Sequence, residues 1–170
     1  MAKVKDGRLM IKVIFVCLGN ICRSPMAEFI FKKMVEERGL KLSFDIDSAA
    51  TSCYEVGNPV YPPAKAVLEK HGISGFHRAR QITKRDVINS DYVLVMDSSN
   101  LLDVLRLTGG AFGERIFKLL SFTGEERDVA DPWYSGNFDR AYEDIYEGCG
   151  CFLEYILKEK KDAIDYDLRH

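Results

Sequence analysis

The sequence has no long hydrophobic run and no excess of charge of either sign. Its first apolar stretch, residues 13–16, has only four residues, which is too short for a signal-peptide core or a membrane-spanning helix. The formal net charge is −2 and no long basic segment occurs, so the composition does not indicate a nucleic-acid-binding surface. We therefore expect a cytoplasmic protein with neither a membrane nor a nucleic acid as its partner.

Cysteine and histidine occur in numbers and positions that suit neither a disulfide framework nor a metal centre. The five cysteines are odd in number and have no framework spacing, so reduced thiols are expected. The three histidines (His71, His77 and His170) form no ligand cluster in the sequence, and neither a metal nor another cofactor is expected. The length of 170 residues, with 46% hydrophobic and 29% charged residues, indicates one globular domain. We expect this domain to span residues 1–170, with its core at about 11–160.

Strands and helices are predicted to alternate along the chain. Apolar and β-branched segments predict four strands, at 11–16, 42–50, 91–97 and 115–122. Helical spacing of apolar residues predicts helices at 24–38, 62–73, 83–90, 98–110 and 138–160, the first with Ser24 as its N-cap. The polar stretch 123–137 is predicted to be a functional loop. This alternation predicts a single α/β domain, a three-layer sandwich in which helices flank a central four-stranded parallel sheet.

The segment VCLGNICRSP, residues 16–25, combines a cysteine at a strand end with an arginine at the start of a helix. In a parallel sheet, ligands bind outside the carboxyl ends of the strands, where Cys17 is expected to lie. Backbone N–H groups of residues 18–23 could form an anion-binding turn, and the Arg23 guanidinium matches two phosphate oxygens. The same positive field would favour the thiolate of Cys17, to which Ser24 could donate a hydrogen bond. The pattern predicts a phosphoryl-binding site with a sulfur nucleophile, although a structural cysteine near a surface arginine would also satisfy it.

A thiolate that attacks a phosphate ester needs an acid to protonate the leaving oxygen. The segment DPWY offers Asp131 within the polar stretch 123–137. Taken alone, this tetrapeptide is more simply interpreted as an ordinary Asp-Pro turn.

Together, FVCLGNICRSPMAE and DPWY resemble the low-molecular-weight protein tyrosine phosphatase family. The segments DSAAT (47–51), HRARQIT (77–83) and VMDSSNL (95–101) extend the resemblance over about 11–157. The resemblance implies metal-independent hydrolysis of phosphotyrosine and aryl phosphate monoesters through a cysteinyl-phosphate. Cys17 would be the nucleophile, Arg23 would bind the phosphate or other oxyanions, and Asp131 would act as acid and then as base. Phosphotyrosine-bearing proteins would be the substrates.

The resemblance also implies which residues surround the reacting groups. The expected substrate-binding residues are Leu18, Gly19, Asn20, Ile21, Cys22, Tyr54, Trp133 and Tyr134. The expected supporting network contains Ser24, Ser48, His77 and Asp97, together with Asn20, which is expected at positive φ. Without the resemblance, Ser48 and His77 would be assigned no function. Relatives that act on phosphoarginine carry threonine where this chain has Ile21, which favours phosphotyrosine.

Two alternative functions belong to other classes. Thiol-dependent arsenate reductases resemble this chain at the loop but use two further cysteines, and no cysteine occurs between Cys53 and Cys149. A catalytically silent phosphate-binding module would not require a nucleophile, an arginine and an acid together. Cys22 matches a second cysteine found in many family members, so redox sensitivity through a reversible Cys17–Cys22 disulfide is a further hypothesis.

Overall fold

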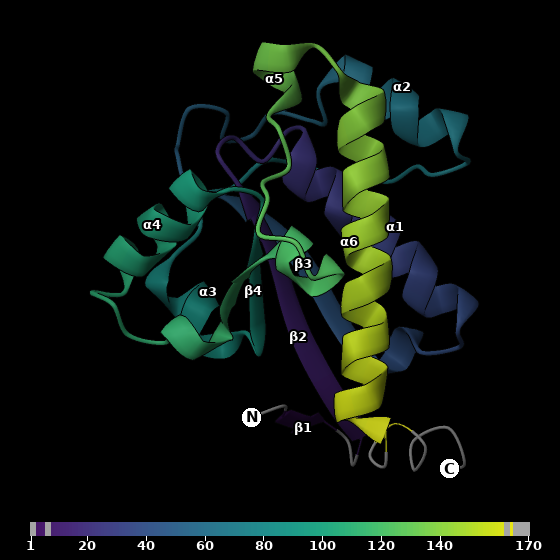
Figure 1. Ribbon diagram of the computed structural model, residues 1–170, viewed down its shortest axis with the longest axis vertical. Helices are drawn as coiled ribbons and strands as arrows, with labels where there is room; N and C mark the ends of the chain where they lie inside the picture. Colours follow the sequence, from purple (N-terminus) through teal and green to yellow (C-terminus); the bar gives the residue numbers. More distant parts are fainter. Residues whose placement is uncertain (1–2, 6–7, 162–163, 165–170) are drawn as a thin grey trace.

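A parallel β-sheet forms the centre of the protein and carries helices on both faces (Figure 1). The computed structural model describes residues 3–5, 8–161 and 164, so His170 lies outside the described residues. β2 (Arg8–Cys17) pairs in parallel with β3 (Phe44–Ala50) and with β4 (Tyr92–Val95), and β4 pairs with β5 (Ile116–Lys118). This arrangement confirms the predicted α/β fold with a four-stranded parallel sheet flanked by helices.

Helices cover both faces of the sheet in the order that the sequence predicts. α1 (Arg23–Glu37), α2 (Pro62–Lys70) and the long α6 (Phe138–Glu159) lie over one face. α3 (Lys84–Asn89) and α4 (Ser98–Leu107) lie over the other (Figure 1). Each begins and ends within a few residues of its predicted bounds. In the part of the chain that the structure describes, no helix is long and apolar enough to cross a membrane.

Side chains of β2 alternate between the two faces and enter two separate cores. Val13 and Phe15 belong to the core that contains α1, α2 and α6, whereas Ile14 and Val16 belong to the core that contains α3 and α4. All four side chains are fully buried. A strand covered on both faces is apolar along its whole length, which explains the run of β-branched residues before Cys17. The sheet therefore holds the loop after β2 on a rigid base.

The predicted start of one helix and the predicted end of one strand are wrong. Ser24 is not the N-cap of α1, because Arg23 is already helical and Cys22 takes the cap position without a side-chain hydrogen bond. The predicted strand 115–122 ends at Lys118 and continues as the 3-10 helix η3 (Leu119–Thr123). Leu119 and its neighbour Leu120 are both buried in the same core, which a strand would prevent by pointing them to opposite faces.

Several short elements were not predicted. β1 (Lys3–Lys5) pairs antiparallel with the first residues of β2, in a region with too few apolar residues to indicate a strand. Within the predicted loop 123–137, α5 (Pro132–Ser135) forms one helical turn. Two further 3-10 turns, η1 (Lys41–Ser43) and η2 (Gly113–Arg115), precede β3 and β5. Of these, α5 matters most for the site, because it begins directly after Asp131.

α6 approaches η3 closely at a glycine. A Cβ atom on Gly148 would lie 2.7 Å from Cγ of Leu119 and 3.1 Å from Cδ2 of Leu120. Gly150, on the same helix, has no neighbouring atom within 4 Å of such a position. The two glycines therefore separate the effect of close packing from the effect of helix propensity.

We expect Gly148→Ala to destabilise the fold, because the added methyl group forces the α6–η3 contact apart. Overpacking of this kind lowers the free energy of unfolding by about 1–3 kcal/mol. Gly150→Ala is the matched control and should raise it by roughly 0.5–1 kcal/mol, since alanine is the better helix former. Urea denaturation of both variants measures the difference, and equal stability of the two would contradict the close approach.

Candidate active site

The loop between β2 and α1 is held from outside by hydrogen bonds to its carbonyl oxygens. Cys17 O accepts from Thr51 N at 2.9 Å, Leu18 O from Ser52 N at 3.1 Å, and Ile21 O from Tyr61 N at 2.8 Å. In a planar trans peptide the C=O and the next N–H point in opposite directions. The N–H groups that follow these carbonyls therefore point into the loop, on Leu18, Gly19 and Cys22. Such a ring of N–H groups can bind an oxyanion.

Asn20 closes this loop in a left-handed backbone conformation with φ 57°. Its side chain is fully buried and donates from Nδ2 to Ser24 Oγ at 2.7 Å and to Ser48 Oγ at 3.0 Å. Its carbonyl accepts from His77 Nε2 at 2.7 Å, and since a carbonyl only accepts, that ring nitrogen carries the hydrogen. Its Oδ1 accepts from Arg80 N at 3.1 Å. These bonds stabilise a backbone conformation that a non-glycine residue rarely adopts.

Two N–H donors and one hydroxyl group surround the Cys17 sulfur. The backbone N–H groups of Asn20 and Ser24 lie 3.3 and 3.4 Å from Sγ, and Ser24 Oγ lies 3.0 Å from it. Groups placed in this way can hydrogen-bond to the sulfur of a nucleophilic cysteine. Burial, followed by the charges of Cys17 and Asp131, raises the pKa of the Cys22 thiol to about 12.

Glu28 completes this network and was missed by the sequence reasoning. Its Oε1 accepts from Ser48 Oγ at 2.6 Å, and its Oε2 pairs with Lys32 at 2.5 Å, although Glu28 itself is buried. Ser48 donates its single hydroxyl hydrogen to Glu28, so it must accept from Asn20. The available signal was helical spacing, because Glu28 follows Ser24 by four positions and so lies on the same face of α1.

Arg23 lies in the protein interior with a relative exposure of 2%. Its Nη1 donates to Asp97 Oδ2 and to Val129 O, both at 2.8 Å, and its Nη2 lies 3.3 Å from Asp131 Oδ2. Burial opposes the charged form, but the negative charges of Cys17, Asp131 and Asp97 outweigh it and raise the pKa of Arg23. Asp97 does not line the pocket, and its hydrogen bond to Nη1 orients the guanidinium.

Asp97 and Asp131 are each fixed at the start of a helix. Asp97 caps α4 by accepting from Asn100 N at 2.8 Å, while the Asn100 side chain accepts from Asp97 N at 3.2 Å. Asp131 caps α5 by accepting from Trp133 N at 3.0 Å through Oδ1, which leaves Oδ2 facing Arg23. Asp131 is thus both the first residue of the Asp-Pro turn and the predicted general acid.

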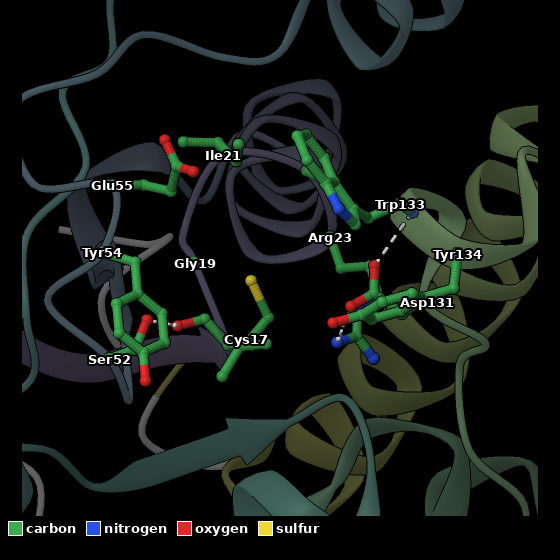
Figure 2. A pocket seen from close by; sticks show the side chains of 12 residues that line it. Cys17, Gly19, Ile21, Arg23, Ser52, Tyr54, Glu55, Asp131, Trp133 and Tyr134 are labelled. Carbon is green, nitrogen blue, oxygen red and sulfur yellow. Dashed lines mark hydrogen bonds and ion pairs between the residues drawn. The ribbon is translucent and has the colours of Figure 1, made fainter.

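A pocket of about 170 Å³ opens over these groups. Tyr54 and Ser52 lie on one side of it and Asp131, Trp133 and Tyr134 on the other, with Cys17 between them (Figure 2). Of the expected substrate-binding residues, the structure brings seven to the pocket: Leu18, Gly19, Ile21, Cys22, Tyr54, Trp133 and Tyr134. Asn20 is not among the lining residues, because its side chain enters the buried network. Ser52 and Glu55 also line the pocket and were not predicted.

Side chains that could ligate a metal do not gather at this site or elsewhere in the described ranges. Over residues 3–5, 8–161 and 164, no group of three histidine, cysteine, aspartate or glutamate side chains could hold a metal ion. The groups that the pocket does present are a sulfur, a guanidinium, a carboxylate and backbone N–H donors. This set can bind a phosphoryl group, attack its phosphorus and exchange a proton with the leaving oxygen.

We expect Arg23→Lys to lower kcat for p-nitrophenyl phosphate roughly 10²–10³-fold, the cost of losing a positioned donor to an oxyanion. Lysine keeps the charge but cannot replace the planar fork that reaches Asp97, Val129 and the pocket together. Arg127→Lys is the matched control, because Arg127 also pairs with carboxylates, Asp144 at 2.9 Å and Glu147 at 3.1 Å, but does not line the pocket. Steady-state kinetics would contradict the assignment if both variants lost activity equally.

Comparison with known proteins gives one consistent family. The model of the family described as "Low molecular weight phosphotyrosine protein phosphatase" matches residues 12–162. The chain is 39% identical to the low molecular weight protein-tyrosine-phosphatase YfkJ of Bacillus subtilis, over 89% of this chain and 99% of that protein. It is 42% identical to the human low molecular weight phosphotyrosine protein phosphatase, over 84% of this chain and 93% of that protein.

Solved structures give the same result. The crystal structure of YfkJ superimposes with a TM-score of 0.86 over 89% of this chain and 97% of that chain. A Drosophila arginine phosphatase superimposes with a TM-score of 0.79 at 34% identity, over 85% of this chain and 97% of that chain. The fold therefore occurs with more than one kind of phosphorylated residue as substrate.

Proposed function

The chain belongs to the low molecular weight phosphotyrosine protein phosphatase family, which makes it a protein phosphatase and a hydrolase, and we propose that Cys17, Arg23 and Asp131 carry out its reaction. The observation that carries the proposal is their convergence at one pocket. The Arg23 guanidinium lies 3.3 Å from Asp131, and the Cys17 sulfur lies in the same pocket (Figure 2).

In the first step, the loop N–H groups and Arg23 hold the phosphate oxygens while the Cys17 thiolate attacks phosphorus. An S–P bond forms, the P–O bond to the tyrosine breaks, and protonated Asp131 gives its proton to the leaving phenolate.

In the second step, ionised Asp131 takes a proton from water, and the resulting hydroxide attacks phosphorus. The S–P bond breaks, inorganic phosphate leaves and the Cys17 thiolate is restored. The two N–H donors and the hydroxyl group around Sγ support both steps, since they can hydrogen-bond to the sulfur as nucleophile and as leaving group.

The pocket walls support phosphotyrosine as the substrate residue. Tyr54 and Trp133 face each other across the pocket and suit a flat phenyl ring, and Trp133 is steadied by Tyr61, whose ring centroid lies 4.9 Å away. Ile21, within the phosphate-binding loop, adds an apolar surface to the pocket, which favours an aromatic ring over a charged guanidinium. The substrates would be phosphotyrosine-bearing proteins.

The cysteine positions argue against the arsenate reductase alternative. The relay of such a reductase uses two further cysteines around a segment near residues 80–95, and no cysteine occurs between Cys53 and Cys149. Cys149 itself is fully buried, and burial raises its pKa. Cys151 lies next to it on α6, away from the pocket lining. Sensitivity of Cys17 and Cys22 to oxidation stays a prediction. A reducing compartment such as the cytoplasm would keep the nucleophile active, and we place the protein there.

We expect Cys17→Ser to abolish hydrolysis of a phosphotyrosine peptide while the protein still binds phosphate, because serine lacks the thiolate but leaves the loop intact. Wild type should act with a chelator present and should prefer the phosphotyrosine peptide to a phosphoarginine substrate. Cys151→Ser, the matched control on α6, should keep wild-type kinetics. Release of inorganic phosphate is the measurement, and turnover by Cys17→Ser or a preference for phosphoarginine would contradict the proposal.

We expect Asp131→Ala to lose about 10²–10⁴-fold in kcat on phosphotyrosine, the usual contribution of a general acid. The loss should be much smaller on p-nitrophenyl phosphate, whose leaving group needs little protonation. Comparing kcat for the two substrates in wild type and variant tests the role. Equal losses on both substrates would show that Asp131 acts in another way.

A further inference from the structure

A second hollow, of about 600 Å³, adjoins the active-site pocket. Both spaces are lined by Leu18, Ser52 and Tyr54, so these residues form a shared wall. Figure 2 shows Tyr54 and Ser52 on the side of the pocket away from Asp131. The hollow continues from this wall to the end of α4, where Arg106 and Leu107 line it. It therefore adjoins the active-site pocket on the side away from Asp131.

A phosphotyrosine peptide that leaves the pocket on the side of Tyr54 brings its neighbouring residues to this wall. Consecutive Cα atoms lie 3.8 Å apart, and an extended peptide advances about 3.3 Å per residue. A side chain only a few positions from the phosphotyrosine can thus enter the hollow. A small aryl phosphate such as p-nitrophenyl phosphate fills the pocket alone and cannot reach it. The hollow is positioned to distinguish one phosphopeptide from another.

The exposed groups of the hollow indicate an apolar ligand. Two of its polar side chains have partners in the protein, since Arg106 pairs with Asp103 at 3.4 Å and Gln81 Nε2 donates to Thr51 O at 3.1 Å. The buried Thr51 Oγ1, which also belongs to the lining, has no hydrogen-bond partner among the described residues. Two of its apolar side chains are exposed to solvent, Tyr54 by 81% and Leu107 by 38%. Removing these two surfaces from water favours the binding of an apolar side chain.

We propose that this hollow binds an apolar side chain that flanks the phosphotyrosine of the substrate, with Tyr54 and Leu107 as specificity-determining residues. The inference rests on the proposed phosphotyrosine phosphatase function and adds to it a preference for sequence around the phosphorylated residue. An apolar subsite of this kind changes kcat/KM by about tenfold or more for one well-placed side chain.

The test uses alanine-based phosphotyrosine peptides that carry a single leucine, lysine or aspartate at one flanking position. For each peptide, kcat/KM is divided by kcat/KM for p-nitrophenyl phosphate, so that changes in the chemical step cancel. In wild type, leucine at one position should raise this ratio above the alanine peptide. Leu107→Lys should lower the ratio for that leucine peptide about tenfold. Leu102→Lys is the matched control, because Leu102 is an exposed leucine of α4 that does not line the hollow.

Each outcome decides the proposal. If leucine gives no advantage at any position, or if both lysine variants lower the ratio equally, the apolar subsite is wrong while the phosphatase function stands. If aspartate is preferred and Arg106→Gln removes the preference, the hollow recognises charge and the proposal is overturned. If wild type hydrolyses neither p-nitrophenyl phosphate nor any peptide, the proposed function itself fails and the subsite fails with it.

Discussion

The buried charge of Arg23 is the constraint on which the site depends. A guanidinium with 2% exposure is tolerated only when its hydrogens and its charge are matched, and removing one partner of a buried pair costs about 3–5 kcal/mol. Its partners come from separate parts of the chain, since Asp97 follows β4 while Val129 and Asp131 precede α5. One cation thus fixes the acid-bearing segment against the sheet and places Asp131 beside the phosphate-binding loop.

The loop itself is rigid for a different physical reason. Its carbonyl oxygens are bound from outside, and the left-handed conformation of Asn20 is fixed by Ser24, Ser48, His77 and Arg80. Because the carbonyl groups point outward, the N–H groups point inward. The proposed phosphate site therefore needs no side chain besides that of Arg23. Glu28 determines the direction of this network, because its carboxylate forces the hydroxyl of Ser48 to donate away from Asn20.

Local sequence patterns predicted most of the fold. They could not predict features that depend on contacts between residues far apart in the sequence. The apolar strand before Cys17, the helix after it and the alternation up to α6 follow from periodicity. The end of β5 does not, because Leu119 and Leu120 turn toward α6, which lies far along the chain. Cys17, Arg23 and Asp131 were indicated by motif and resemblance. Ser52, Glu55 and the hollow beside α4 carry no local signal, since only the folded sheet brings 51–54 next to 103–107.

In the proposed mechanism, handling of the phosphate and choice of the substrate are physically separate. The thiolate, the guanidinium and the inward N–H groups would recognise a phosphoryl group without regard to what carries it. A structure of this fold that is named an arginine phosphatase is consistent with that separation. Discrimination must therefore come from residues that the phosphate does not touch. In our proposal Ile21, Tyr54 and Trp133 select the ring, and the surface beyond Tyr54 selects its neighbours. Substrate preference can thus change through exposed side chains while the buried network around Arg23 and Asn20 stays the same.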